Sequence, residues 1–407
     1  MEINFYSQRL AAKPNLLKQI NYARLLDLLR CRAPITRAEL ARCTGLTRST
    51  VTLITAELIA NGLVIESQDL VTTPGSGRPG IGLLLNSEGA FFIGASIEVE
   101  HITVVKLNLA AQIIDRIQEP IEGSRTPELV LDRLVQLINQ MRQSHPGHEL
   151  RLRGVGLTVQ GSLNLDGIVL HAPFLDWHNV DLRSYLQPHL NLPLFVDNDA
   201  NAAALAEVYL GSAMQTNSLL FLLINRGMGS GIIINNRVFR GALGTAGEVG
   251  AIPINPYSSI YDRVGWRKDL GTLVGKETLL QRYHERGGKA SDISDLLVHL
   301  AQAEPLAKEI VFEWAQILGW GIIVLVNILN PERIVIGGSL SALLPYVKDR
   351  LDAMLHNYAP GNGTNGFFSN MEASFGASKF GEDASAVGGA VLVYQSLFQV
   401  PDLVLLE

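Results

Sequence analysis

The stretch from Thr36 to Gly62, TRAELARCTGLTRSTVTLITAELIANG, constrains the chain most, because it predicts two helices joined by a tight turn. Thr36 with Glu39 three residues later is a capping-box pattern, which opens a short helix through Cys43. Gly45 follows where the chain must turn. A short helix, a glycine turn and a second helix form the helix-turn-helix arrangement that enters the major groove of DNA.

The second helix of this stretch predicts the surface that would face DNA. Its apolar residues recur at helical spacing and are expected to face inward; they are Val51, Ile54, Leu58 and Ile59. An ordinary helical hairpin in a protein core is the alternative interpretation. Small hydroxyls and arginines at the exposed end favour DNA, because they suit base edges and phosphates. The predicted DNA-binding residues of this stretch are Arg37, Thr47, Arg48, Ser49, Thr50 and Thr52.

The segment after Gly62 predicts a pair of strands, LVIESQDLV and IGLLLN, separated by the Gly/Pro-rich piece TTPGSGRPG. This piece is either a flexible loop or a DNA contact. The second interpretation rests on Arg78, which Pro79 holds extended between glycines. An arginine on a slim backbone fits the narrow, A·T-rich minor groove.

Charge is divided unevenly along the chain, although the net charge is -6. Residues 1–80 carry a balance of +4 and the remainder a balance of -10, as counted along the sequence. A basic head on an acidic body is consistent with one domain that meets phosphates. Cys31 and Cys43 are the two cysteines of the chain, too few for a disulfide framework or a zinc cluster, and we expect both to be buried apolar residues.

No apolar run in the sequence is long enough to predict a membrane-spanning segment. The longest run, Ile317 to Leu329, is shorter than the roughly 20 residues that span a bilayer, so a buried helix is expected there. The N-terminus lacks the apolar core of a signal peptide. The cytoplasm is therefore the expected compartment, with no membrane partner.

From Ala90 the pattern changes to strands in runs and strands that alternate with helices. FFIGASIEV, ITVVKLNL and QIIDRIQ predict three successive strands, followed by a helix, and SLLFLLINRGMGSGIIINNRVFRG predicts a hairpin with a Gly-rich turn. The body is therefore expected to be α/β with a mixed sheet. Two similar halves would leave a cleft between them, where a ligand would bind.

Several of these segments together resemble the ROK family of repressors, open reading frames and sugar kinases. FVDNDANAAALAE (195–207) is similar to the family's catalytic-loop segment, GALGTAGEVGAIPINP (241–256) to its second signature, and IVIGGSL to a late nucleotide-side strand. RPGIGLLLN after a helix-turn-helix resembles the junction in the family's regulators, the N-acetylglucosamine and xylose repressors among them. The resemblance covers about residues 15–395.

The resemblance implies an N-terminal winged helix-turn-helix on an actin-like, two-lobed sugar-kinase (ROK) fold. The domains expected from it are 1–85 for DNA binding, with a Gly/Pro-rich wing or linker, then 86–200 with 376–407 as the first lobe and 201–375 as the second. The ligand-binding residues that it implies are Gly161, Asn198, Asp199 and Glu248. Asn198 and Asp199 have an alternative role, since either could simply cap the helix that follows.

The departures from the family pattern argue against kinase activity. The first phosphate turn is GASIEVE (94–100), with Ser96 in place of the usual Asp and with Glu98 and Val99 in place of glycines. A carboxylate there would repel phosphate, and the loss of glycine would block the approach of backbone N–H groups. The second turn, NRGMGSG (225–231), keeps its glycines. We therefore predict no enzyme activity, no catalytic residue and no cofactor.

The metal site and part of the sugar site are also altered. Ala251 stands where the family has a histidine, and no cysteine follows it as far as Gly275, so we predict no zinc. Phe174 replaces an Asn, and Gly271 stands at the place of a second Glu. Lost polar contacts of this kind cost about 1–3 kcal/mol each where a partner is left unpaired. The ligand therefore differs from a simple hexose, or sugar sensing has been lost.

The sequence thus predicts a DNA-binding transcriptional regulator of carbohydrate-related genes, acting as a repressor. Its expected partners are a double-stranded DNA operator, a sugar or sugar-phosphate effector, and further copies of itself in a homodimer or tetramer. A sugar kinase with an accessory N-terminal domain is one alternative. A regulator controlled by a protein partner, with a vestigial cleft, is the other.

Overall fold

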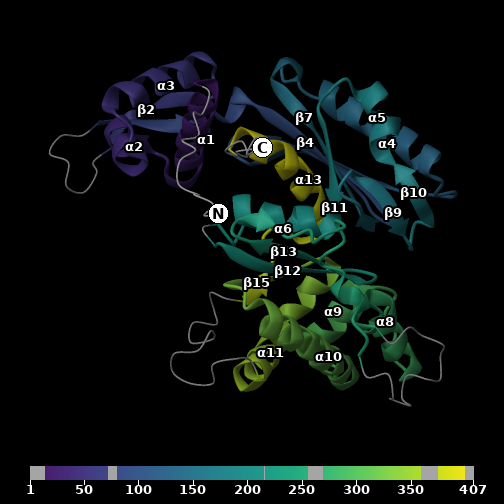
Figure 1. Ribbon diagram of the computed structural model, residues 1–407. Helices are drawn as coiled ribbons and strands as arrows, with labels where there is room; N and C mark the ends of the chain where they lie inside the picture. Colours follow the sequence, from purple (N-terminus) through teal and green to yellow (C-terminus); the bar gives the residue numbers. More distant parts are fainter. Residues whose placement is uncertain (1–13, 72–79, 215, 255–268, 359–374, 399–407) are drawn as a thin grey trace, which may run out of the picture.

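The computed structural model describes residues 14–71, 80–214, 216–254, 269–358 and 375–398. Figure 1 shows a small N-terminal part, here called the head (residues 14–85), beside a larger part called the body (86–398). Arg78 lies outside the described residues, as does most of the segment between Ala251 and Gly275.

The head consists of three helices and a small antiparallel sheet with the strand order β1-β3-β2. Its elements are α1 (Pro14–Arg32), β1 (Ile35–Thr36), α2 (Arg37–Thr44), α3 (Arg48–Ala60), β2 (Val64–Val71) and β3 (Gly80–Leu85). The predicted caps are confirmed, because Thr36 accepts a hydrogen bond from the backbone N–H of Glu39 and Thr47 one from that of Thr50, both at 3.2 Å. Gly45 adopts a φ of 70° and ends α2. Cys31 and Cys43 are half-buried, so the expectation of burial was wrong.

The body contains two five-stranded sheets with equivalent strand order, β11-β7-β4-β5-β6 and β16-β15-β12-β13-β14. In each sheet an antiparallel three-strand meander is extended by two parallel strands. The first sheet comprises β4 (Phe91–Ile97), β5 (His101–Asn108), β6 (Ile113–Pro120), β7 (Leu152–Val159) and β11 (Leu194–Asn198). The second comprises β12 (Ser218–Ile224), β13 (Met228–Ile234), β14 (Arg237–Val238), β15 (Arg333–Gly337) and β16 (Phe375–Ala377). The two similar halves expected from the strand pattern are thus present.

Two helices, α6 (Asp199–Leu210) and α13 (Ala384–Tyr394), lie between the sheets and pack against each other (Figure 1). Each crosses over: α6 follows the first sheet but packs on β12 and β13, and α13 follows the second sheet but packs on β4 and β7. Their contacts are close because both helices are rich in alanine and glycine. A Cβ on Gly388 of α13 would lie 2.3 Å from the backbone of Ala202 of α6.

The outer faces of the sheets are covered by the remaining helices. Both faces of each sheet are apolar, because successive residues of a strand point to opposite faces. In β12, Leu219 and Phe221 face α6, whereas Leu220 and Leu222 face the helices on the opposite side. The first sheet carries α4 (Pro127–Gln143) and α5 (Leu182–Leu190). The second carries α7 (Leu270–Val274), α8 (Lys276–Glu285), α9 (Ile293–Ala301), α10 (Pro305–Leu329) and α11 (Leu344–Tyr358).

Helix α10 begins at Pro305 and contains the apolar run Ile317 to Leu329, for which a buried helix was expected. Its 25 residues are long and apolar enough to cross a membrane by length and composition, and it is the one such helix in the part of the chain that the structure describes. Within its most apolar window, 61% is buried inside the protein. That burial is typical of the core helix of a globular domain.

A small sheet of β8 (Ser162–Leu163), β9 (Ile168–Ala172) and β10 (Trp177–Asp181) was not predicted. The sequence indicated only a turn at QGSLNLDG, and β8 and β9 pair across that turn. Strands of two to five residues give no clear alternation, and β10 is mostly exposed, so the pattern was too short to detect. The β9–β10 turn of this sheet carries Phe174, whose ring lies against Arg226 of the second half of the body.

The close packing of α13 on the first sheet gives a test of the fold. A Cβ on Gly156 of β7 would lie 1.8 Å from the carbonyl oxygen of Gly389, so Gly156→Ala must push the helix and sheet apart. We expect a loss of about 1–3 kcal/mol or more in the free energy of unfolding, measured by urea denaturation. Gly376→Ala in β16 is the matched control, because nothing lies within 4 Å of the added carbon. Equal stability of the two variants would contradict this packing.

Candidate ligand cleft and nucleic-acid interface

The start of α3 brings most of the predicted DNA-binding residues onto one surface. Arg48, Ser49 and Thr52 are exposed. The guanidinium of Arg48 has no hydrogen bond or ion pair with the other described residues. The hydroxyls are partly engaged already, because Thr47 Oγ1 lies 2.8 Å from Thr50 Oγ1 and Thr52 donates to the carbonyl of Arg48 at 2.8 Å. These hydroxyls keep acceptor lone pairs for a ligand.

Arg37 has a different position from the rest of that set. Its Nε donates to Thr55 Oγ1 at 3.1 Å, and its Nη2 contacts Glu66 Oε1 at 2.8 Å. It therefore joins α2, α3 and β2 inside the head. A DNA contact by Arg37 stays a prediction, and it would have to share or replace the contact with Glu66.

In the body, the N-terminal end of α6 brings together Gly161, Asn198 and Asp199. Asn198 caps α6, since its Oδ1 accepts from the backbone N–H groups of Ala200 and Asn201 at 2.9 and 3.1 Å. Its Nδ2 donates to the carbonyl of Gly161 at 2.9 Å. The capping alternative raised from the sequence is therefore present. A ligand contact by Asn198 would use its remaining amide proton.

The carboxyls of Asp199 and Glu248 interact at the N-terminal end of α6. Asp199 is buried, and burial raises the pKa of its carboxyl to about 7, with a further contribution from the charge of Glu248. Glu248 keeps contact with solvent at the cleft, and desolvation by the surrounding walls also raises its pKa. A carboxyl with a pKa of about 7, such as that of Asp199, can be a donor as well as an acceptor near neutral pH, which suits a ligand rich in hydroxyls.

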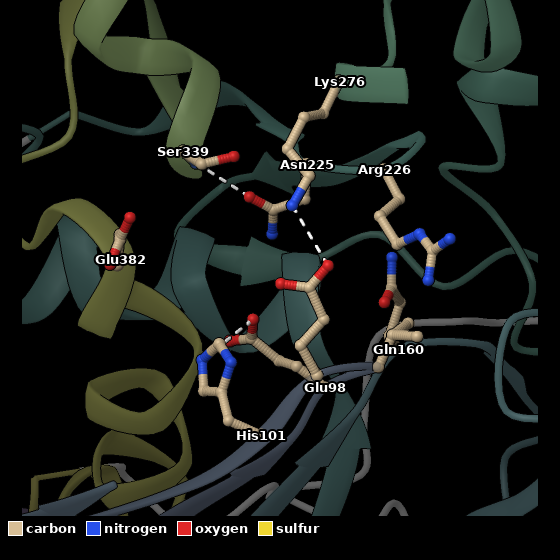
Figure 2. A pocket seen from close by; sticks show the side chains of 10 residues that line it. Glu98, His101, Gln160, Asn225, Arg226, Lys276, Ser339 and Glu382 are labelled. Atoms are coloured by element: carbon tan, nitrogen blue, oxygen red, sulfur yellow. Dashed lines mark hydrogen bonds and ion pairs between the residues drawn. The ribbon is translucent and has the colours of Figure 1, made fainter. Parts of the chain in front are cut away.

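A cavity of about 190 Å³ lies between the β4–β5 turn of the first sheet and the β12–β13 turn of the second (Figure 2). Glu98 lines it and is largely buried, and burial followed by the charge of Asp199 raises the pKa of Glu98 to about 8. The hydroxyl of Ser96 is 3.4 Å from Glu98 Oε1, and His101 Nε2 is 3.5 Å from Glu98 Oε2. A carboxyl group thus occupies the turn that would have to hold phosphate in a kinase.

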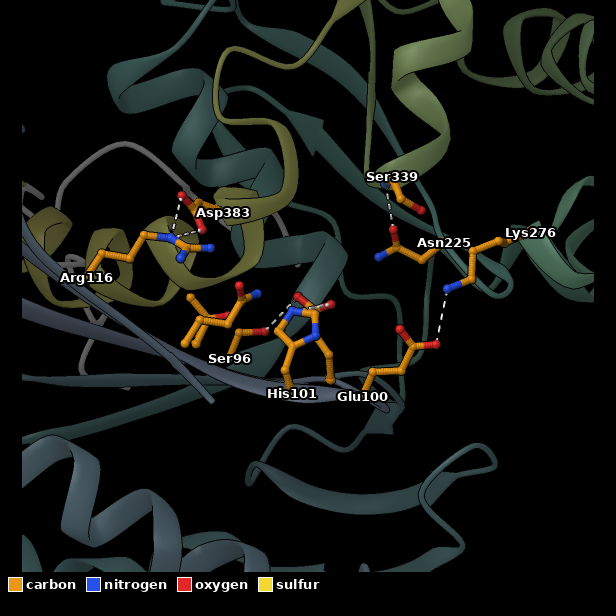
Figure 3. Close-up of polar contacts among 11 residues, drawn as sticks. Ser96, Glu100, His101, Arg116, Asn225, Lys276, Ser339 and Asp383 are labelled. Atoms are coloured by element: carbon orange, nitrogen blue, oxygen red, sulfur yellow. Dashed lines mark hydrogen bonds and ion pairs between the residues drawn. The ribbon is translucent and has the colours of Figure 1, made fainter. Parts of the chain in front are cut away.

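Three contacts bridge the two halves of the body around this cavity. Lys276 of α8 binds Glu100 at 3.1 Å (Figure 3), and the Arg226 guanidinium lies 5.5 Å from the centre of the Phe174 ring. The third is the pair of Arg240 and Asp197, at 2.8 Å. Sequence reasoning missed these basic residues, since a lysine or arginine outside a motif gives no signal of its partner.

Phe174 and Gly271 are two positions at which the sequence departs from the family's sugar-site pattern, and the structure shows what surrounds each of them. Phe174, which replaces a polar residue of the family pattern, packs on Arg226 across the cleft. A side chain at Gly271 would place its Cβ 3.1 Å from Gly250 Cα, so the neighbouring backbone would have to shift slightly to accept it. No group of three or more His, Cys, Asp or Glu suited to a metal occurs among the described residues.

The head and body meet at the other end of α6. Arg30 of α1 donates from Nη1 to the carbonyl of Tyr209 at 2.5 Å, and its guanidinium lies 5.1 Å from the Tyr209 ring centre. Asp27 binds the same guanidinium at 2.7 Å. The side chain of Arg30 is only 12% exposed, so it is buried between the two parts.

These features define a class of protein: a two-lobed, sugar-kinase-like body joined to an N-terminal helical head. The family model described as "ROK family" matches residues 92–396. The chain belongs to the ROK family.

Its relatives identify the branch of the family. The chain is 31% identical to a xylose repressor of Caldicellulosiruptor bescii over 80% of this chain and 84% of the relative. It is 26% identical to the transcriptional dual regulator NagC of Escherichia coli over 82% and 85% of the two chains. A solved ROK-family transcriptional regulator, a homologue of the E. coli MLC protein, superposes with a TM-score of 0.76 at 26% identity over 94% of this chain and 97% of that chain.

A glucokinase of Halalkalibacterium halodurans is also similar, at 28% identity over 75% of this chain and 95% of the relative. That match covers a smaller share of this chain than two of the xylose-repressor matches and the regulator structure, which cover 94–96% of it. The protein is therefore a ROK-family transcriptional repressor, and its relation to the family's kinases lies in the body.

The raised pKa of Glu98 predicts how stability depends on pH. Glu98 is protonated in the folded state up to a pKa of about 8, whereas an unfolded Glu ionises near pH 4.3. The folded state therefore binds more protons between these values, and stability falls as the pH rises through them. We expect Glu98→Gln to raise the melting temperature relative to wild type at pH 8.5, with a smaller gain at pH 5. Glu122→Gln at the exposed surface is the control, and a difference independent of pH would contradict the assignment.

Proposed function

We propose that this protein is a ligand-responsive repressor of carbohydrate-related genes, with a winged helix-turn-helix head that binds an operator and a body that binds a sugar without phosphorylating it. The order of α1, β1, α2, α3 and the β2–β3 pair supports a winged helix-turn-helix. The domain limits proposed are those expected from the sequence, 1–85 for the head, 86–200 with 376–407 for one lobe, and 201–375 for the other.

The observation that carries this proposal is the position of α6. Its N-terminal end holds Asp199 close enough to Glu98 of the cavity for the two charges to interact, and its C-terminal end holds Tyr209 against Arg30 of the head. Twelve residues of helix span about 18 Å. A ligand that moved the end of α6 in the cleft would therefore move the contact on which the head rests. Such a ligand must bind the two arrangements with different affinity.

The turn that contains Glu98 supports a body without kinase activity. Phosphoryl transfer requires the phosphates of ATP to be held and oriented. A buried carboxyl disfavours phosphate when it is ionised, and its side chain fills the space that glycine would leave free. Sugar-dependent ATP turnover by the purified protein would overturn this part of the proposal.

The partners that we propose follow from the repressor role. Operators for helix-turn-helix proteins are commonly two-fold symmetric, so a homodimer or tetramer in the cytoplasm is expected. The names of the relatives make xylose and N-acetylglucosamine, with their phosphates, the first effectors to test. Control by a protein partner is the remaining alternative, and it predicts that no sugar stabilises the protein.

The exposed arginine of α3 gives a test of the head. Arg48→Ala should weaken binding to a selected operator duplex at least tenfold, because a free cation at the helix start is lost. The slope of log affinity against log salt should fall by about one if the contact is to phosphate. Arg350→Ala, on α11 of the body, is the matched control. Unchanged binding by Arg48→Ala would show that α3 is not the recognition helix.

The two ends of α6 give a test of the sensor. An effector found by thermal shift among sugars and sugar phosphates should stabilise wild type and lower its operator affinity. Asp199→Ala should lose the thermal shift, whereas Arg30→Met should keep the shift but lose most of the effect on operator affinity. Arg30→Met keeps the aliphatic stem and removes the contact with Tyr209. Normal induction of the Arg30→Met variant would exclude α6 as the connection.

A further inference from the structure

One side chain on the exposed face of α3 is apolar. Leu53 is 63% exposed, although Val51, Ile54 and Leu58 of the same helix are buried. Leu53 lies between Ser49 and Ala56 at spacings of four and three residues, so these three side chains share one face. Sequence reasoning assigned only polar residues to this face and passed over Leu53.

The face around Leu53 has almost no charge, unlike a helix surface that is simply solvated. Arg48 and Glu57 are the charged residues of α3. Glu57 is bound to Lys18 of α1, with Nζ 2.8 Å from Oε2. The face therefore presents short, uncharged side chains around a single leucine, with a free cation at the first turn. Glu57 lies four residues after Leu53 and borders the same face, but its charge is paired with Lys18, so it opposes the approach of a polyanion less than a free carboxylate would.

We propose that Leu53 is a specificity-determining residue that contacts the C5-methyl group of a thymine in the major groove. The inference rests on the proposed function, because it requires α3 to be the recognition helix. The thymine methyl is the apolar group that base pairs present in the major groove, and it distinguishes thymine from the other bases. Ser49 and Ala56 are short, so they allow the helix to approach the base edges until the leucine reaches the groove floor.

The test removes the methyl group from the DNA and its partner from the protein. Full-length wild type first selects its preferred sites from random-sequence duplexes. One selected duplex is then remade with each thymine replaced in turn by deoxyuridine, which lacks only the 5-methyl group. Affinities are measured for wild type, Leu53→Ala, Leu53→Met and the control Leu150→Ala, which removes a leucine that is 93% exposed on the body.

We expect one or more deoxyuridine positions to weaken wild type, Leu53→Met and Leu150→Ala about fourfold, the effect of one lost apolar methyl contact. At the same positions Leu53→Ala should be unaffected. Equal sensitivity of wild type and Leu53→Ala at every thymine would overturn the assignment. If Leu53→Ala binds the selected duplex as wild type does but fails to dimerise, Leu53 meets a second copy of the chain and the assignment is also overturned.

Failure of the underlying function gives a different result. If wild type selects no duplex at all, the DNA-binding role of the head fails, and the assignment of Leu53 fails with it. If selection succeeds and only the sensitivity pattern is absent, the head binds DNA and the assignment of Leu53 alone is wrong.

Discussion

The contact between α6 and α13 is the constraint on which the rest of the body depends. Gly94 and Gly156 of the first sheet lie against α13, and Gly231 of the second lies against α6, each so closely that a Cβ would be within 2.4 Å of helix backbone. Two helices can share the space between two sheets only if their side chains are small. The alanines of α6 and the glycines of α13 meet that requirement. Because each helix crosses to the opposite sheet, neither half of the body can move without displacing them.

The cleft depends on the same packing. The first turn of α6 packs on the second sheet, since a Cβ on Gly231 would lie 2.4 Å from the carbonyl oxygen of Ala200, and this contact positions Asn198 and Asp199. The bridge of Lys276 and Glu100 is weaker, since this pair is partly exposed, whereas Asp197 of the pair with Arg240 is buried. An exposed ion pair contributes about 0–1 kcal/mol. The contacts between the halves are therefore closest along the central helices, and the ion pair at the cavity contributes little to holding the halves together.

Much of this arrangement could be predicted from the sequence where a pattern is long. The caps at Thr36 and Thr47, the three-strand meander after Ala90 and the Gly-rich hairpin are local features, and each is present. The small β8–β10 sheet was missed because its strands are too short to alternate. The contacts that bridge the halves were missed for a different reason. Glu100 and Lys276 are 176 residues apart, and no local pattern indicates that the fold brings them together.

The roles of single residues were less predictable than their positions, because a role depends on which partners the fold supplies. Arg37 was predicted to contact DNA, and the fold also gives it Thr55 and Glu66 as partners inside the head. Leu53 was assigned no role from the sequence, and the fold leaves it exposed on a face with little charge. No sequence pattern indicated a role for Arg30, whose side chain packs against the end of α6. A repressor needs its signal to reach the head, and the buried Arg30 contact lies at the opposite end of the helix that starts in the cleft.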